Sequence, residues 1–339
     1  MRYIIIGAGA VGGAVGGRLA QSGREVVLVA RGAHLAALRA GGLRLRVPEG
    51  ELTYRLPAVD GPDALGELRA DDVLVLAVKT QDTEAALAAW GPAPVAGGGT
   101  AAERLPLLCA QNGVEGQRLA LRRFRHVYGV CVWLPSAHVE PGVVSAAGTP
   151  LTGMLHLGQY PYGTDDTLRR IAADLERAHF GAPVVPDVSR WQYAKLLGNL
   201  ANAIEAVSGP PESEQARALY DRVRAEGEAV LAVAGIAYAS PEEQKEARGD
   251  RITLVPLPGA QRGGGSSWQS LTRGTGTIEA DHLNGEIVLL GRLHGVPTPV
   301  NELLQRLANT FARERRTAGS LPVAELVRLA DEVDQESGR

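Results

Sequence analysis

A glycine-rich run near the amino terminus carries the clearest chemical signal in this sequence. It consists of Gly7, Ala8, Gly9, Ala10, Val11 and Gly12, and it follows directly on the apolar stretch Tyr3–Ile6. In a strand–turn–helix unit, the first glycine permits the turn, the second lets the backbone approach a pyrophosphate, and the third lets helix and strand pack. The helix N-terminus then offers N–H groups to the anion. The run therefore predicts a dinucleotide site; because the chain holds 42 glycines, a purely structural turn is the alternative.

The type of dinucleotide depends on the residue that ends the second apolar run, residues 25–30. NAD-specific sites place Asp or Glu there to bind the ribose hydroxyls, whereas this run is followed by Arg31. A guanidinium can bind a phosphate through two parallel hydrogen bonds, which suits the 2′-phosphate of NADP(H). The sequence therefore predicts NADP(H), with His34 and Arg39 as candidate helpers, unless Arg31 is only a surface residue at a helix start.

Short apolar runs alternate with helical patterns over the first half of the chain and must position these residues. The apolar runs predict strands over residues 2–6, 25–30, 73–78, 105–110, 127–134 and 184–185. From Trp191 the spacing is helical, which predicts helices over residues 190–207, 212–234, 277–294, 299–316 and 321–333. We expect an α/β Rossmann-like dinucleotide-binding domain, residues 1–186, followed by an all-α domain, residues 187–339, with a loop over 256–265.

Composition argues against several other functions. The 339 residues include 35 basic and 38 acidic side chains, a net charge of −3, which favours neither a nucleic acid nor a membrane surface as partner. The two cysteines, Cys109 and Cys131, lack metal or redox spacing, and no metal site is predicted. No stretch reaches the roughly 18 apolar residues of a membrane span. Arg18 interrupts the apolar start before any signal-peptide cleavage site, so a cytoplasmic protein is expected.

Further motifs occur in the order found in one family. They are Val78-Lys79-Thr80, Gln111-Asn112-Gly113, Lys195-Leu196-Leu197-Gly198-Asn199, Ser266-Ser267-Trp268, Thr277-Ile278-Glu279-Ala280-Asp281 and Asn284-Gly285. Together with the glycine-rich run and Arg31, they make the chain resemble ketopantoate reductase (2-dehydropantoate 2-reductase) over nearly its whole length. The resemblance implies reduction of a 2-oxo acid by NADPH. It also implies a Rossmann domain followed by a helical domain, with the active site in the cleft between them.

The resemblance assigns roles to three residues of the second half. Lys195 becomes the catalytic proton donor, since an ammonium group can stabilise a developing alkoxide and protonate it. Glu279 would keep Lys195 protonated, orient substrate hydroxyls and contact the cofactor. Ser267 would bind the substrate carboxylate. The structural alternatives are a solvated lysine, a carboxylate at a helix start and a helix cap.

Two asparagines are candidate substrate ligands. Asn199 is four residues after Lys195 and therefore on the same helix face. Family members usually carry a second asparagine eight residues after the lysine; here that position is Ala203, and Asn202 is the candidate instead. Trp268 replaces a smaller residue, and it either narrows the pocket or joins the core. These departures leave the identity of the 2-oxo acid open.

Lys79 and Asn112 follow the third and fourth predicted strands, at the sheet edge where cofactors bind. We expect Lys79 near the nicotinamide ribose and Asn112 near the ribose or the substrate, although Asn112-Gly113 is also a common turn. The expected reaction is hydride transfer from NADPH to the 2-oxo carbon of 2-dehydropantoate, giving pantoate. The alternatives are another 2-oxo acid and a non-catalytic NADP(H)-sensing protein. The apolar helical half is compatible with a homodimer.

Overall fold

Contacts group the chain into two units in the computed structural model, which describes residues 1–138, 140–210, 212–257 and 264–337. The first unit is Met1–Gln192 with Ala239–Gln261, and the second is Tyr193–Tyr238 with Arg262–Arg339. This division falls just after the predicted boundary between residues 186 and 187, and it returns a later segment to the first unit, which the sequence did not indicate. Residues 258–263 of the predicted loop lie outside the described residues.

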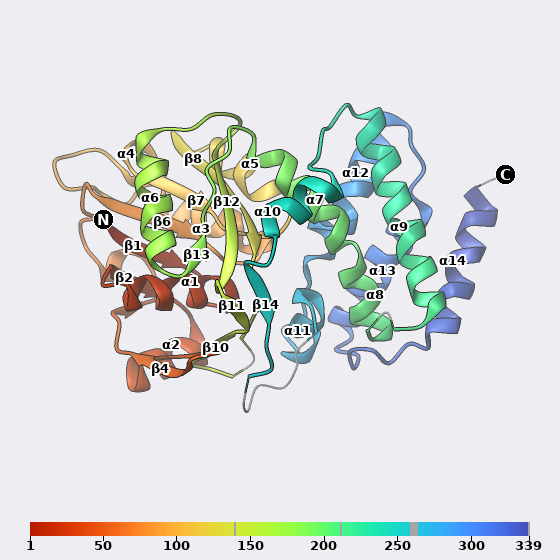
Figure 1. Cartoon of the computed structure of the whole chain (residues 1–339), viewed down its shortest axis with the longest axis horizontal. Helices are drawn as coiled ribbons and strands as arrows, with labels where there is room; N and C mark the ends of the chain where they lie inside the picture. Colours follow the sequence, from red (N-terminus) through yellow and green to blue (C-terminus); the bar gives the residue numbers. More distant parts are fainter. Residues whose placement is uncertain (139, 211, 258–263, 338–339) are drawn as a thin grey trace. The chain divides into compact units, whose positions relative to one another are not determined.

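An eight-stranded sheet forms the centre of the first unit, in the order β13-β12-β8-β7-β6-β1-β2-β5 (Figure 1). The six neighbouring strands β5, β2, β1, β6, β7 and β8 are parallel to one another. β12 is antiparallel to β8, and β13 is parallel to β12. Their bounds are β1 Arg2–Ile6, β2 Glu25–Val29, β5 Ala58–Val59, β6 Asp72–Leu76, β7 Pro106–Cys109, β8 His126–Trp133, β12 Gly153–Gln159 and β13 Phe180–Gly181. The order of the parallel strands, which reverses between β1 and β6, is that of a dinucleotide-binding sheet.

Helices cover both faces of this sheet (Figure 1). One apolar core joins the sheet to α1 and α6, and a second joins it to α3, α4 and α5. Their bounds are α1 Ala10–Gln21, α3 Thr83–Trp90, α4 Ala101–Arg104, α5 Glu115–Leu121 and α6 Asp166–Arg177. In β1, Tyr3 and Ile5 enter the first core, whereas Ile4 and Ile6 enter the second. Burial on both faces explains the uninterrupted apolar runs, and the predicted strands up to residue 134 are confirmed.

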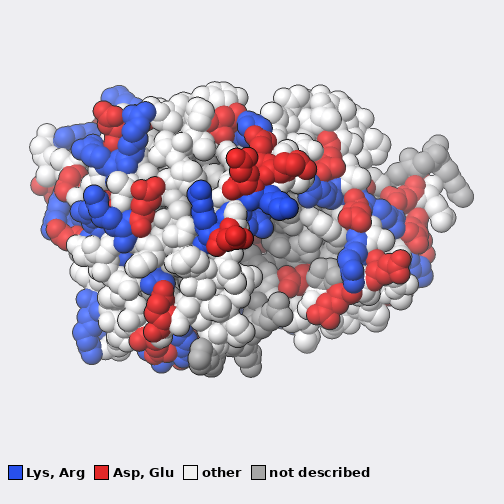
Figure 2. Space-filling view, in the orientation of Figure 1, with Lys and Arg blue, Asp and Glu red and all other residues white. Residues whose placement is uncertain are grey.

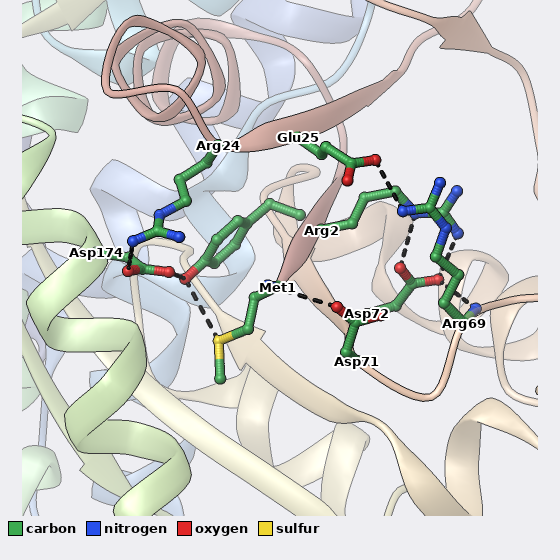
Figure 3. Close-up of polar contacts among 9 residues, drawn as sticks. Met1, Arg2, Arg24, Glu25, Arg69, Asp71, Asp72 and Asp174 are labelled. Carbon is green, nitrogen blue, oxygen red and sulfur yellow. Dashed lines mark hydrogen bonds and ion pairs between the residues drawn. The ribbon is translucent and has the colours of Figure 1, made fainter.

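Two polar clusters fix the start of β1 (Figure 3). Arg2 donates from Nε and Nη2 to the buried carboxylate of Asp72 at the start of β6, at 2.7 and 2.6 Å. Tyr3 Oη donates to Asp174 Oδ2 in α6 at 2.8 Å, and Arg24 pairs with the same carboxylate at 2.6 Å. Burial, and then the hydrogen bond to Asp174, raise the pKa of Tyr3. These contacts anchor the end of β1 opposite the glycine-rich run.

Smaller elements of the first unit were not predicted. A four-stranded sheet has the order β4-β3-β10-β9, and β11 pairs with β14 in a two-stranded sheet. The bounds are α2 Gly32–Gly41, β3 Leu43–Val47, β4 Gly50–Tyr54, β9 Ser136–Ala137, β10 Val143–Ala146, β11 Gly148–Pro150, α10 Pro241–Arg248 and β14 Ile252–Leu254. The strand predicted at 184–185 is wrong: Val184 makes an isolated bridge with Leu157, and the strand in this region is β13.

Every helix or strand that the structure describes in the second unit is a helix, as the sequence predicts. α7 (Val188–Asn199) leads into it, followed by α8 Ala201–Ser208, α9 Glu214–Val233, α11 Ser266–Thr272, the 3-10 helix η3 Glu279–His282, α12 Asn284–His294, α13 Pro299–Arg313 and α14 Val323–Ser337. The helix predicted over 190–207 divides at Leu200. Asn284 Nδ2 donates to the carbonyl oxygen of Leu200 at 3.3 Å, which coincides with this division.

Neither a membrane-spanning helix nor a cluster of metal-binding side chains occurs among the described residues. Basic and acidic side chains intermix on the face shown in Figure 2. None of the described helices is both long and apolar enough to cross a membrane. The described His, Cys, Asp and Glu side chains form no group of three or more that could hold a metal ion.

Candidate functional site

The glycine-rich run lies where the strand order of the large sheet reverses. Ile6, the last residue of β1, pairs with Val29 of β2 on one side and with Leu76 of β6 on the other. Gly7 follows with φ +102°, and a Cβ there would come within 2.7 Å of the backbone nitrogen of Val78. The chain can therefore turn from β1 toward α1 only with glycine at this position.

The other two glycines of the run differ in what surrounds them. A Cβ on Gly12 would lie 2.1 Å from the carbonyl oxygen of Gly7 and 2.8 Å from Cγ2 of Ile5, so glycine lets α1 pack on β1. A Cβ on Gly9 would meet no other part of the described chain within 4 Å. Gly9 is the N-cap of α1, and no side chain caps this helix. Open space beside an uncapped helix N-terminus fits the pyrophosphate of a dinucleotide.

His34, a candidate helper for a 2′-phosphate, contacts backbone through both ring nitrogens. Its Nδ1 accepts a hydrogen bond from the backbone N–H of Gly142 at 2.9 Å, so Nε2 donates to the carbonyl oxygen of Ala8 at 2.8 Å. Burial lowers the pKa of His34 below its usual value, although the bond to Ala8 opposes this. Both nitrogens of the neutral ring are hydrogen-bonded to backbone, so in this structure the ring stabilises the glycine-rich run and has neither a positive charge nor a spare N–H donor. Arg39 Nε donates to the carbonyl oxygen of Ala58 at 3.0 Å.

Arg31 stands at the end of β2, as predicted, and has an acidic partner that the sequence did not indicate. It is the N-cap of α2 and is 72% exposed. Its Nη2 lies 3.5 Å from Oδ1 of Asp82, which is 43% exposed. Asp82 ends the 3-10 helix η2 (Thr80–Asp82), which follows β6. No carboxylate follows β2 itself, but Asp82 reaches Arg31 from the helix that follows β6.

Lys79 and Asn112 also lie at the carboxyl edge of the sheet. Lys79 is the half-buried N-cap of η2, and Asn112 is half-buried beside Gly113, whose φ of +78° marks the Asn-Gly turn. The hydroxyl of Thr80 donates to the carbonyl oxygen of Asn112 at 3.4 Å. The loops that carry Lys79 and Asn112 are therefore in contact.

Gln111 is a positioning residue that the sequence analysis did not single out. Its Nε2 donates to the carbonyl oxygen of Val78 at 2.9 Å and to the hydroxyl of Thr83 at 2.8 Å. A Cβ on Gly116 would lie 2.1 Å from its Oε1, so glycine there makes room for the buried amide. Gln111 thus ties the loop after β7 to the loop after β6, next in the chain to Lys79 and Asn112.

In the second unit, Lys195 and Asn199 lie one turn apart on α7. Both are half-buried, whereas Leu196 and Leu197 are fully buried. The Nδ2 of Asn199 is buried and has no hydrogen-bond partner among the described residues. An unpaired buried amide is costly, and an oxygen of a bound substrate would satisfy it.

Glu279 is nearly inaccessible, with 2% of its surface exposed, and it opens η3. Its Oε2 accepts a hydrogen bond from the hydroxyl of Ser266 at 3.2 Å. Burial lowers the pKa of Arg273, and the negative charge of Glu279 opposes that effect. Ser267, the predicted carboxylate ligand, is buried in α11. The serine that contacts Glu279 is Ser266, which the sequence analysis had not assigned to any role.

Asn202 lies beside the start of α11. A Cβ on Gly265 would come within 3.1 Å of Asn202 Oδ1, and the N–H of Gly265 donates to Glu205 Oε2 at 2.8 Å. Ala203, the position at which family members usually carry the second asparagine, is buried and apolar. The ring of Trp268 packs against Gly319, where a Cβ would lie 2.8 Å from Cζ3.

Comparison with known proteins adds a family to this geometry. Residues 3–162 match the family model "Ketopantoate reductase PanE/ApbA", and residues 187–312 match its C-terminal counterpart. A 2-dehydropantoate 2-reductase of Mesorhizobium japonicum is 30% identical, covering 93% of this chain and 99% of that protein. The structure of a PanE/ApbA family ketopantoate reductase from Ralstonia eutropha JMP134 is 29% identical, with a TM-score of 0.75 over 93% of this chain and all of that one.

The same fold occurs in a more distant enzyme. The ternary structure of D-mandelate dehydrogenase with NADH and anilino(oxo)acetate has a TM-score of 0.75, covering 94% of this chain and 100% of that chain. Its sequence identity to this chain is 21%, so the similarity is one of fold.

Proposed function

Given that the chain belongs to the ketopantoate reductase family, and is therefore an oxidoreductase, we propose that it reduces 2-dehydropantoate to pantoate with NADPH. The paired family matches carry this proposal. The first covers the glycine-rich run, Arg31, Lys79 and Asn112, and the second covers Lys195, Asn199 and Glu279. When bound, NADPH supplies the hydride that the 2-oxo carbon receives.

The residues of the first unit would hold the cofactor. The N–H groups at the start of α1 would bind the pyrophosphate beside Gly9, where open space supports the assignment. Arg31 would bind the 2′-phosphate through its exposed guanidinium. Lys79 and Asn112 would lie near the nicotinamide ribose, on loops held in place by Gln111.

The residues of the second unit would handle the substrate. Lys195 would stabilise the alkoxide that develops at the 2-oxo carbon and give it a proton from its ammonium group. Asn199, whose buried Nδ2 has no partner among the described residues, would donate to a substrate oxygen. Glu279 would keep Lys195 in its charged form, and Ser266, bonded to that carboxylate, would orient it toward a substrate hydroxyl. Asn202 and Ser267 remain proposed substrate ligands.

One observation favours a second candidate, the reduction of a different 2-oxo acid. The position eight residues after Lys195 is the buried Ala203, and the nearby amide comes instead from Asn202, which lies against Gly265. The break in the helix at Leu200 falls between Lys195 and Asn202, so the amide does not follow the geometry of one continuous helix. This shift would change which substituents of the substrate find a hydrogen-bond partner.

Steady-state oxidation of NADPH by the purified protein tests the proposal. Ketopantoate is compared with pyruvate, 2-oxoisovalerate and phenylglyoxylate, and kcat/KM is expected to be highest for ketopantoate. Faster turnover of another acid would favour the second candidate. Binding of NADPH without turnover of any acid would favour the non-catalytic NADP(H)-sensing alternative.

A further inference from the structure

An ion pair spans the edge of the sheet where the dinucleotide is proposed to bind. Arg31 follows β2, and Asp82 belongs to the 3-10 helix that follows β6. In the sheet, β1 lies between these two strands. Neighbouring strands are about 4.8 Å apart. The side chains of Arg31 and Asp82 therefore start from the ends of two strands on either side of β1, and they meet with Nη2 and Oδ1 3.5 Å apart.

The ion pair between Arg31 and Asp82 contributes too little to the stability of the fold to explain why both residues are present. The two side chains are 72% and 43% exposed, and an exposed ion pair of this kind adds little to the stability of a fold. Neither residue belongs to the two apolar cores of the first unit. The position of the carboxylate, at the reversal of the strand order, is instead the place where ligands bind in open α/β sheets.

The two charged groups of the pair suit the two forms of the adenosine ribose, with a 2′-phosphate or with a 2′-hydroxyl. A site that takes NAD places a carboxylate at the end of the second strand, where it accepts a hydrogen bond from the 2′-hydroxyl. This chain has Arg31 at that position, and Asp82, which comes from the helix after β6, brings a carboxylate to within 3.5 Å of its guanidinium. One site therefore presents a cation suited to a 2′-phosphate and an anion suited to a 2′-hydroxyl.

We propose that Asp82 is a specificity-determining residue that allows the protein to bind NADH as well as NADPH. Its carboxylate accepts from the ribose 2′-hydroxyl of NADH, repels the 2′-phosphate of NADPH and competes with that phosphate for Arg31. The inference rests on the proposed function, because it takes the ribose of the dinucleotide to lie beside Arg31. A like charge about 5 Å from the phosphate, at an effective dielectric constant of about 40, weakens binding about tenfold.

Direct binding of both cofactors to the Asp82→Asn variant tests this inference. Dissociation constants for NADPH and NADH are measured by quenching of tryptophan fluorescence, with no 2-oxo acid present. The variant is expected to bind NADPH about tenfold more tightly and NADH several-fold more weakly. Asp166→Asn is the matched control: Asp166 is 94% exposed in α6 and pairs with Arg169 at 2.8 Å, so the change removes a similar ion pair elsewhere in the unit. It should leave both constants unchanged.

The outcomes separate this inference from the proposal on which it rests. A ratio of the two dissociation constants that stays within twofold of the wild-type ratio overturns the role of Asp82. An equal gain in affinity for both cofactors also overturns it, since that indicates a general effect of charge and no recognition of the ribose. If the wild-type protein binds neither cofactor, the proposed function itself fails. If the Tm of Asp82→Asn equals that of the wild type, any change in the dissociation constants arises from the binding site and not from a damaged fold.

Discussion

Two alanine substitutions in the glycine-rich run should separate folding stability from cofactor binding: one should lower the stability, and the other should weaken the binding of NADPH. Gly12→Ala places a Cβ 2.1 Å from the carbonyl oxygen of Gly7 and 2.8 Å from Ile5, so α1 must move away from β1. Overpacking of this kind costs about 3 kcal/mol. For a unit of this size, that corresponds to a loss of roughly 6–12 °C in Tm.

Gly9→Ala should leave the fold almost unchanged. The new Cβ meets nothing within 4 Å, and the φ of −74° at Gly9 suits any L-residue. The poorer N-cap and the lower entropy of the unfolded chain roughly cancel, so Tm should stay within about 2 °C. The methyl group instead stands where the pyrophosphate would approach α1. Loss of one charge-assisted hydrogen bond, about 1.5–3 kcal/mol, weakens NADPH binding at least about tenfold.

Thermal unfolding without ligand and titration with NADPH measure both effects on the same preparations. Gly12→Ala should unfold earlier, and Gly9→Ala should unfold normally but bind NADPH poorly. Wild-type affinity for NADPH in Gly9→Ala would refute the assignment of the open space to the pyrophosphate. A wild-type Tm in Gly12→Ala would refute the packing role of the third glycine.

Three further changes probe other parts of the molecule. Lys195→Ala should lower kcat at least about a hundredfold in the NADPH assay and leave the dissociation constant of NADPH unchanged; near-normal turnover would remove Lys195 from proton transfer. Burial lowers the pKa of His156 from 6.5 to about 4, so the folded protein loses stability as the pH falls from about 6.5 to about 4, by up to about 3 kcal/mol. His156→Phe should flatten that dependence in urea unfolding at pH 7 and pH 5, and an unaltered slope would contradict this cause. Glu205→Ala should cost about 1 kcal/mol in urea unfolding, because the N–H of Gly265 loses its acceptor. Glu205→Gln should restore most of that loss, and equal losses in both variants would show that the acceptor is unimportant.

The sequence predicted the strands of the large sheet where burial on both faces leaves a strong local signal. The run Tyr3–Ile6 is such a case, since its side chains alternate between two apolar cores. β12 was missed because its residues Gly153–Gln159 include glycine, histidine and glutamine, although all but the last are buried. β3 alternates buried and half-buried residues, but its parallel partner β10 comes from a distant part of the chain. No local sequence pattern indicates that two such distant segments pair.

The candidate site shows the same division between local and long-range information. The roles of Gly7 and Gly12 could be predicted because they depend on one strand–turn–helix unit. The contact of Arg31 with Asp82 could not be predicted, since it joins the ends of two strands that are separated by a third. The contact of Ser266 with Glu279 likewise joins two separate elements, α11 and η3, and no local spacing indicates it. Features that depend on residue type and local spacing can therefore be predicted from the sequence, whereas contacts between distant segments depend on the fold.

Transfer of a labelled hydride tests the central claim most directly. The wild-type protein is supplied with ketopantoate and NADPH that carries deuterium at C4 of the nicotinamide, on either face in separate reactions, and the product is analysed by mass spectrometry and proton NMR. One of the two labelled cofactors should give pantoate with a single deuterium at C2, and the other should give unlabelled pantoate. Oxidation of NADPH without label in the product from either cofactor, or no conversion of ketopantoate, would contradict the proposed reaction.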